Sequence, residues 1–227
     1  MTLVLLLSAA SVAQAPNGNS KPASEKQILK NSKVEVSRVE VAAGESLPQN
    51  GRGHDSVTVF VTTPQARHKL LGKTVPGFGG GVEEGDVWFH SAGAADAGEH
   101  KDKGPLSAVV VEFVDAQGKT KNVGKKSQTC VPDKQACIEE KELFCTEKVC
   151  VEDVTMAPGA MSMRHSHATD HMLVAISDYQ LTDEVEGRGT VVRTKQAGEV
   201  EYIPAGITHQ LKNTGQAPAR FAVIVWR

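Results

Sequence analysis

The sequence predicts an all-β protein built from two copies of one β-unit, and three observations support this prediction. Short runs of β-branched and aromatic residues recur along the chain, and Gly, Pro or Asp bounds most of them. Convincing helical periods are scarce. A set of short motifs returns at a nearly constant distance in the second half of the chain. Many short strands with frequent turn signals are typical of a β-sandwich or a β-barrel.

The repeat is clearest in two pairs of segments. Residues 85–93 lie 113 residues before residues 198–206, and glycines stand at both ends of each copy. Residues 57–61 lie 115 residues before residues 172–176. A fixed offset is a stronger signal than any single motif. The predicted strands are residues 34–36, 38–41, 57–61 and 108–113 in the first copy and residues 149–154, 172–176, 189–193, 199–203 and 221–226 in the second.

Five segments follow from this repeat. They are a signal peptide at 1–15, a polar lead segment at 16–33, a first β-unit at 34–118, a Lys- and Cys-containing linker at 119–147 and a second β-unit at 148–227. The lead segment is polar and has no strong period. Within the linker, residues 132–144 are rich in helix formers and predict one short helix.

The N-terminus resembles a secretory signal. An apolar run from Leu3 to Leu7 is followed by small residues and an Ala-x-Ala cleavage site ending at Ala15. The absence of Lys and Arg before Leu3 and the position of Pro16 after the cut weaken this interpretation, and a cytosolic protein with a short apolar N-terminus is the alternative. We predict a secreted or periplasmic protein. No other run approaches the roughly 18 apolar residues of a membrane span.

All four cysteines lie between Cys130 and Cys150. An even, clustered count in an exported chain predicts two disulfides. Nearest-neighbour pairing, Cys130 with Cys137 and Cys145 with Cys150, is one of three connectivities. A four-cysteine zinc site is the alternative, which the lack of a Cys-x-x-Cys pair disfavours.

Composition and charge exclude some partners. The 227-residue chain has a formal charge of −2 at pH 7, and 40 % of its residues are hydrophobic, which suffices for ordinary cores. A nucleic-acid-binding protein would be expected to carry a strongly basic field, and this chain has none. We therefore expect no nucleic-acid partner.

Three of the eight histidines stand within seven residues, at His165, His167 and His171. On a single strand, residues i, i+2 and i+6 share one face, so all three imidazoles could point into one cavity. Neutral imidazole is the commonest protein ligand of divalent transition ions. Downstream, a tight turn at Pro204 to Gly206 would direct His209 back toward the same cavity.

Two motifs around these histidines resemble those of the cupin superfamily. The matched positions are Gly159, His165 and His167 in the first motif and Gly198, Pro204, Gly206, His209 and Asn213 in the second. Two positions depart from the family pattern. His171 stands where the family usually has glutamate, and Asp178 stands where it usually has glycine.

The resemblance implies two tandem cupin-type jelly-roll β-barrels, a bicupin, with a metal inside the second barrel. Carried over by position, the metal ligands are His165, His167, His171 and His209. Four neutral ligands would leave the full double positive charge on the ion, which favours an anionic substrate or an enolate.

The identity of the metal is open among Fe, Mn, Cu, Zn and Ni, because imidazole suits all five. Met161 and Met163 share the parity of His165, so one of them could face the same cavity and indicate copper. Methionine is more often a filler of hydrophobic cores.

The first copy lacks the histidines of the second. The residues opposite His165, His167, His171 and His209 are Asn50, Arg52, Ser56 and Asp96. A permanent positive charge on Arg52 opposes cation binding, so we expect this copy to be a structural partner. Two alternatives are an anion site at Arg52 and a relocated site using His54, His90 and His100.

Two functions remain open at this stage. The first is a metal-dependent enzyme of oxygenase or isomerase type that acts on a small organic substrate. The second is a non-catalytic module of the cell envelope that binds a metal or small ligand, since no general acid is recognisable. Asp170 has the wrong parity for the cavity, and the facing of Tyr202 is undetermined. We expect a small-molecule partner, and a homodimer is one association that exposed strand edges would allow.

Overall fold

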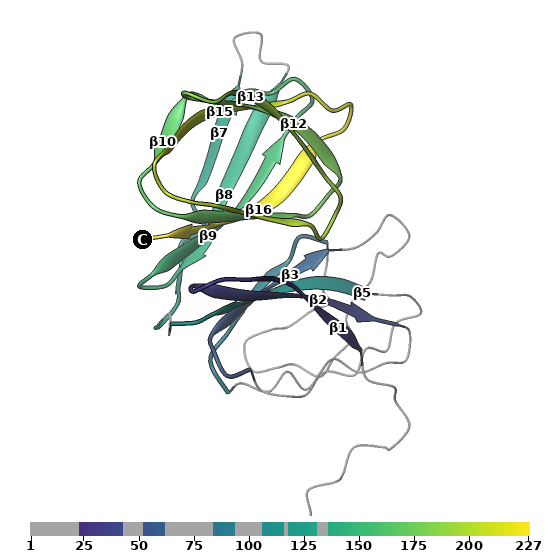
Figure 1. Cartoon of the computed structure of the whole chain (residues 1–227), viewed down its shortest axis with the longest axis vertical. Helices are drawn as coiled ribbons and strands as arrows, with labels where there is room; N and C mark the ends of the chain where they lie inside the picture. Colours follow the sequence, from purple (N-terminus) through teal and green to yellow (C-terminus); the bar gives the residue numbers. More distant parts are fainter. Residues whose placement is uncertain (1–22, 43–51, 62–83, 94–105, 116–117, 131–135) are drawn as a thin grey trace, which may run out of the picture.

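A computed structural model of the chain describes residues 23–42, 52–61, 84–93, 106–115, 118–130 and 136–227, and these residues form β-strands and no helix (Figure 1). The strands are β1 (Ser24–Lys30), β2 (Val34–Val41), β3 (Ser56–Val61), β4 (Val87–His90), β5 (Leu106–Phe113), β6 (Lys121–Asn122), β7 (Lys126–Cys130), β8 (Cys137–Cys145), β9 (Val149–Met156), β10 (His165–His167), β11 (His171–Ala175), β12 (Tyr179–Val185), β13 (Gly189–Lys195), β14 (Val200–Ile203), β15 (Ile207–Asn213) and β16 (Ala219–Trp226). In this part of the chain, the search for a helix long and apolar enough to cross a membrane finds none.

The two halves of the chain build sheets with the same strand order. The N-terminal sheet runs β1-β2-β5-β3-β4, and the C-terminal sheet contains the series β8-β9-β16-β11-β14. Strands β2 and β3 begin 115 residues before β9 and β11, and strands β4 and β5 begin 113 residues before β14 and β16. The predicted all-β repeat is therefore confirmed.

The two corresponding sheets pack face to face (Figure 1). Successive residues of a strand point to opposite faces, and β5 shows the result. Val109, Val111 and Phe113 lie in the core between the two sheets, whereas Leu106 and Val110 point into the N-terminal unit. The inter-sheet core also takes residues from β2, β3, β8, β9, β11 and β16.

A second sheet of four strands, in the order β10-β15-β12-β13, completes the C-terminal barrel. Its interior is a separate hydrophobic core that includes Leu173, Leu181 and Phe221. Strand β11 contributes to both cores, because Met172 and Val174 face the N-terminal sheet while Leu173 faces the barrel interior. The interior of the barrel thus lies directly behind the inter-sheet core.

Polar contacts between the units are reciprocal. Arg38 Nη1 donates to the carbonyl of Ala197 (3.3 Å), and Arg220 Nη1 donates to the carbonyl of Glu84 (3.0 Å). Each carbonyl precedes a turn glycine, Gly198 or Gly85, with φ near +83° and +85°. A Cβ at either glycine would lie within 2.9 Å of the guanidinium from the other unit and would displace it, while the positive φ itself favours glycine at both positions.

The segments outside the repeat also contain strands, and the predicted helix is wrong. The lead segment contributes β1, which pairs with β2 along its length. The linker contributes β6, β7 and β8 to the C-terminal sheet. Residues 137–144, which belong to the helix predicted at 132–144, lie on strand β8, because pairing with β7 on one side and β9 on the other outweighs local helix propensity.

Two disulfides hold β8 to its neighbours. Cys130 pairs with Cys137 across β7 and β8, and Cys145 pairs with Cys150 across β8 and β9. The prediction of two disulfides is confirmed, with nearest-neighbour connectivity. The predicted signal peptide at 1–15 falls outside the described residues.

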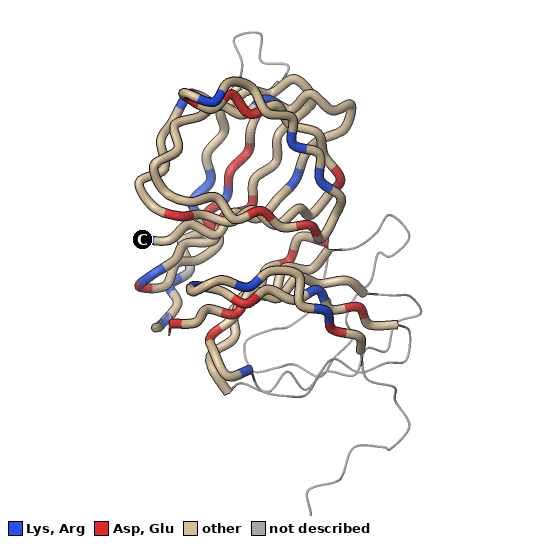
Figure 2. The backbone as a smooth tube through the Cα atoms, in the orientation of Figure 1, with Lys and Arg blue, Asp and Glu red and all other residues tan. Residues whose placement is uncertain are grey.

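Charged residues of both signs are interspersed over both units (Figure 2). The formal charge of the whole chain is −2.

Candidate metal centre

Two neighbouring strands bring three histidines together inside the C-terminal barrel. His165 and His167 are separated by one residue on β10, so they point to the same side. His209 on β15 lies directly opposite His165 in the antiparallel register. The side chains of Ser166 and Thr208, the adjacent pair, hydrogen bond at 2.8 Å and tie the two strands together.

The nitrogen atoms of these histidines converge. Nε2 of His167 lies 3.0 Å from Nε2 of His165 and 3.1 Å from Nε2 of His209. Imidazole nitrogens bound to one ion at about 2.1 Å, in tetrahedral or octahedral geometry, are separated by about 3.0–3.4 Å. The arrangement therefore fits a divalent transition ion, and His165, His167 and His209 could hold it.

The opposite ring nitrogens are fixed by hydrogen bonds. Nδ1 of His165 lies 2.8 Å from the carbonyl oxygen of Met163, and Nδ1 of His209 lies 2.9 Å from Oδ1 of Asp183. Both acceptors require a proton on Nδ1, which leaves Nε2 free to bind a cation. Such partners fix the tautomer and ring orientation of metal-binding histidines.

Asp183 is itself held in place by Arg193. The guanidinium donates to Oδ2 of Asp183 from Nε (2.8 Å) and Nη2 (2.6 Å), and it also contacts Glu201. Burial alone would raise the pKa of the Asp183 carboxyl, but the hydrogen bonds from His209 and Arg193 outweigh it and lower that pKa. Asp183 thus remains an anion behind His209.

The fourth histidine comes from the other sheet. His171 begins β11, so the predicted single strand from 165 to 171 is wrong, because the chain turns between the two sheets at residues 168–170. The imidazole of His171 stacks on that of His167, with centroids 3.8 Å apart and planes 23° apart. Its Nδ1 atom is buried and has no hydrogen-bond partner among the described residues. His171 therefore faces the same site from the opposite wall.

Burial keeps two of these histidines neutral. Desolvation and the neighbouring imidazoles lower the pKa of His167 to about 4 and that of His171 to about 3. A neutral ring can bind a cation without first losing a proton. His167 and His171 thus offer neutral rings to a cation.

A cavity of about 110 Å³ adjoins the histidines. Most of its wall is apolar, formed by Ile138, Val154, Met156, Leu173, Ile203, Leu211, Phe221, Val223 and Val225. Typical pockets for drug-sized ligands are several times larger, at about 300–1,000 Å³. The cavity therefore suits a small molecule.

Glu152 on β9 is a cavity residue that the sequence did not reveal. Its cross-strand partner on β16 is Val223, an interior residue, so Glu152 also points into the barrel. Glu142 stands directly opposite it on β8, although like charges in this position are destabilising. Burial raises the pKa of Glu152, and the carboxylates of Glu140 and Glu142 raise it further. No hydrogen bond or ion pair joins Glu152 to a described residue.

Other candidates are excluded or explained. Met161 and Met163 are exposed and do not line the cavity, so they do not support copper. Arg52 is bound by Glu25 (3.0 Å) and Glu112 (2.6 Å), so its charge is already compensated, and an anion site there is not supported. A second cluster, Glu142 with Cys145 and Cys150, cannot offer thiolates, because its sulfurs form a disulfide.

The structure describes some of the first-copy residues that the sequence singled out, but not others. His54 is exposed, and Ser56, the counterpart of His171, begins β3 and is buried. Asn50, Asp96 and His100 lie outside the described residues.

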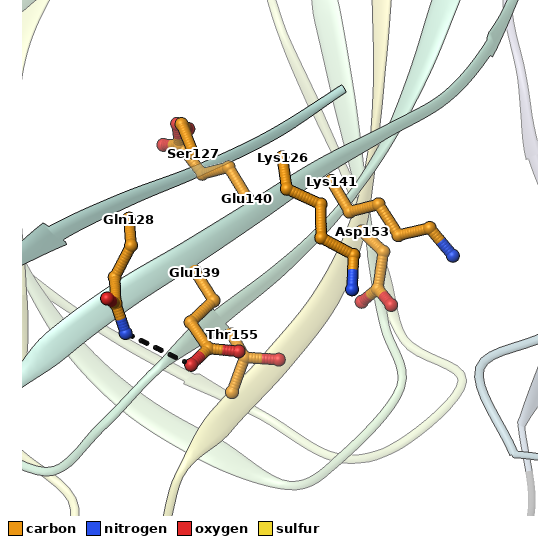
Figure 3. Close-up of a pocket in the computed structure, with 8 residues that line it drawn as sticks. All are labelled: Lys126, Ser127, Gln128, Glu139, Glu140, Lys141, Asp153 and Thr155. Carbon is orange, nitrogen blue, oxygen red and sulfur yellow. Dashed lines mark hydrogen bonds between the residues drawn. The ribbon is translucent and has the colours of Figure 1, made fainter. Parts of the chain in front are cut away.

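A larger hollow of about 560 Å³ lies over the β7–β8 hairpin and β9 (Figure 3). Its walls are charged or polar, and they include Lys126, Lys141 and Asp153. Gln128 Nε2 donates to Glu139 across the hairpin at 3.2 Å. Charges of both signs alternate there, so no set of like ligands converges on one point.

Comparison with known proteins decides the family. Residues 152–225 match the cupin domain family. The C-terminal barrel is a cupin domain. A segment of 70 residues is 36 % identical to the xanthan biosynthesis protein XanB of Xanthomonas campestris pv. campestris, covering 30 % of this chain and 14 % of that protein. The chain thus corresponds to a small part of its curated relative.

Solved structures extend the likeness beyond the cupin domain to about nine-tenths of the chain. AerE from Microcystis aeruginosa matches 90 % of this chain and 98 % of its own, with a TM-score of 0.61 and 11 % identity. Oxalate decarboxylase from Bacillus subtilis matches 91 % of this chain and 72 % of its own, with a TM-score of 0.59 and 13 % identity. At these identities the likeness shows the fold, which is that of two tandem cupin-type barrels.

Proposed function

We propose that this protein is an exported, metal-dependent enzyme of oxygenase or isomerase type that acts on a small organic substrate in its C-terminal barrel. The observation that carries the proposal is a single small cavity with imidazoles on one side and the unpartnered carboxyl of Glu152 on its wall. A binding module needs the imidazoles but not a carboxyl with a raised pKa. That carboxyl favours catalysis over the non-catalytic alternative.

We assign the metal ligands as His165, His167, His171 and His209. Three of them already present ligand atoms within 4.8 Å of one another. His171 lies outside that group of three, but its ring stacks on that of His167 beside the same cavity, and its buried Nδ1 has no hydrogen-bond partner among the described residues. A divalent ion held there would supply Lewis acidity to a substrate oxygen. The Mn(II) centres of B. subtilis oxalate decarboxylase, a protein of similar fold, make manganese the first metal to test.

Glu152 would handle the proton. A carboxyl whose pKa lies above its usual range holds its proton more tightly than an ordinary carboxyl, which suits a group that exchanges a proton with a substrate. Its position on the cavity wall allows it to reach a substrate that is bound by its oxygens at the histidines. Apolar residues around both groups exclude water and strengthen the electrostatic interaction between substrate and site.

The size of the cavity restricts the substrate to a few heavy atoms. Small hydroxy acids, diketones and dicarboxylates such as oxalate fit this limit and can bind an ion through two oxygens. Two disulfides, which persist in oxidising compartments, support export. The test panel also includes phenols, which are the largest substrates that we would test.

The first experiment is metal analysis of untagged protein. We expect about one transition ion per chain, and a metal-free wild type that takes up none on addition contradicts the proposal. Product formation and oxygen uptake are then measured on the substrate panel with the metal-loaded protein.

The second experiment separates catalysis from binding. We expect Glu152→Gln to lose most activity on the identified substrate while it retains one ion per chain. Glu139→Gln, on the outer face of β8, serves as the matched control and should behave as wild type. Full activity in Glu152→Gln would remove Glu152 from the chemistry, and no turnover by wild type on any substrate would favour the binding module.

A further inference from the structure

The loop that carries the metal ligands is fastened to the N-terminal barrel. Asp170 lies between His167 and His171 in the turn from β10 to β11. Lys33, in the turn between β1 and β2 of the other unit, donates from Nζ to Oδ2 of Asp170. The side chain of Asp170 is only 15 % exposed, so this ion pair sits at the boundary of the two units.

Each carboxylate oxygen of Asp170 is used. Oδ2 also accepts from the hydroxyl of Tyr202 on β14 (2.6 Å), and Oδ1 accepts from the backbone N–H of Ala205 (2.7 Å). The carbonyl of Asp170 accepts from the N–H of Trp226 (3.0 Å). One side chain therefore joins the first histidine motif, the turn before His209 and the N-terminal barrel.

Hydrogen bonds hold the backbone of Lys33 in place. Oδ1 of Asn31 accepts from the backbone N–H groups of Lys33 (2.8 Å) and Val34 (2.9 Å). The carbonyl of Lys33 accepts from the N–H of Val114 (2.9 Å), which follows β5. These contacts fix the Lys33 backbone, and its side chain, which is 46 % exposed, extends from there to Asp170.

The first copy shows which of these contacts belong to the fold alone. Asp55, 115 residues before Asp170, accepts from the N–H of Ala92 (2.7 Å), which lies 113 residues before Ala205. The counterpart of Tyr202 is Phe89, which has no hydroxyl. The aspartate and its backbone contact are thus common to both copies, whereas the Tyr202 hydroxyl has no equivalent in the copy without the histidines.

We infer that Lys33 is a positioning residue for the metal centre, acting through Asp170 to set the placement of His167 and His171. The N-terminal barrel, which contributes none of the four histidines, then contributes to metal affinity. This inference rests on the proposed function for its metal readout. A broad hydrophobic core joins the two units independently of Lys33, so loss of the ion pair should leave the barrels together.

The test compares Lys33→Met, Lys33→Arg and Lys30→Met in the full chain. Lys30 pairs with Glu35 within the same hairpin, so it is the matched control. Co²⁺ is the probe, because its visible spectrum reports coordination geometry as well as affinity. Backbone amide exchange of residues 167–171 in metal-free protein supplies a readout that needs no metal.

We expect Lys33→Met to weaken Co²⁺ binding about 3- to 10-fold, below the roughly 10- to 100-fold that direct partners of ligands contribute, and to change the Co²⁺ spectrum. Amide exchange of the loop should become faster. Lys33→Arg should restore both readouts, and Lys30→Met should leave both unchanged.

Two failures are distinguishable. If wild type binds Co²⁺ and Lys33→Met matches it in affinity and amide exchange, the positioning role is overturned and the proposed function stands. If wild type binds no ion, the proposed function fails, and amide exchange alone decides whether Lys33 positions the loop. Equal effects of Lys33→Met and Lys30→Met would also overturn the inference, because they would indicate a general loss of hairpin stability.

Discussion

The two barrels share a framework and differ in what it carries. Strands β2, β5, β3 and β4 of the N-terminal sheet have the same order as β9, β16, β11 and β14 of the C-terminal sheet. Even local hydrogen bonds repeat. Gly93 N–H donates to the carbonyl of Arg52 (2.9 Å), as Gly206 N–H donates to that of His167 (2.8 Å). Where the second copy has His167 and His171, the first has Arg52 and Ser56. The candidate metal site is therefore separable from the fold and depends on a few side chains.

The largest effect should come from removing histidines in the second copy. Removing Arg52, the counterpart of His167 in the first copy, should leave metal binding unchanged. We expect the double substitution His165→Ala and His167→Ala to weaken metal binding more than about 100-fold, because even the outer partners of ligands contribute 10- to 100-fold. Arg52→Ala should leave one ion per chain. Elemental analysis and titration with Mn²⁺ check this, and equal losses in the two variants would contradict the assignment of the site to the second barrel.

The interface between the copies should dominate stability. Phe113 is fully buried between the sheets and makes an edge contact with Trp226, with centroids 6.1 Å apart. We expect Phe113→Ala to lower the free energy of unfolding by about 3–5 kcal/mol. Denaturant unfolding followed by tryptophan fluorescence measures this.

The same experiment tests whether the copies unfold together. Because the sheets share one core, we expect a single transition that shifts as a whole in Phe113→Ala. Two separate transitions, with the cupin domain unchanged, would show that the barrels are independent. Phe60→Ala, in the interior of the N-terminal unit, is the comparison for a buried phenylalanine outside the interface.

Acid should destabilise the metal-free protein through two histidines of the second copy. In metal-free protein, His167 and His171 have folded-state pKa values of about 4 and about 3, below the ordinary value of 6.5. Between about pH 6.5 and pH 3 the unfolded chain binds more protons than the folded one. The free energy of unfolding therefore falls as the pH decreases across this range. The midpoint of thermal unfolding measured across this range checks the prediction. Substitution of both histidines by asparagine should flatten the profile, and an unchanged slope would contradict the cause.

The smallest effects should come from the hairpins. Cys145 and Cys150 close the β8–β9 hairpin, and the residues 115 positions earlier, Lys30 and Glu35, form an ion pair across the β1–β2 hairpin. We expect replacement of both cysteines by serine to cost about 2 kcal/mol, since the closed loop is short. Loss of the exposed Lys30 pair should cost less than about 1 kcal/mol. Urea unfolding ranks the two, and an equal cost would show that the disulfide adds nothing to the hairpin.

Much of the fold could be predicted from sequence, because interior strands carry their pattern locally. Val57 to Val61 and Met172 to Ile176 read as strands, and their constant offset revealed the repeat. Strand β1 escaped detection since nearly all of its side chains are exposed, which removes the alternation. Strand β8 has a helix-like composition, and only its pairing with two neighbours makes it a strand.

The candidate site was predictable in its ligands but not in its surroundings. The histidines stood out by spacing and by their match to the two motifs. Glu152 did not stand out, because the register with β16 decides which face of the sheet its side chain occupies. A single sequence does not give that register. Asp170 has the wrong parity for an acid or base in the cavity. In the structure its carboxylate accepts hydrogen bonds from Lys33, Tyr202 and Ala205 and so joins three segments of the chain.

Strand β11 has one face in the inter-sheet core and the other beside the cavity. The histidines occupy positions that the first copy fills with other residues, so the framework does not need them. The framework does need the first unit, because without it Met172 and Val174, beside His171, would face water. The first barrel persists as an obligatory wall of the second, and recombination that separates them should yield neither a stable fragment nor a working site.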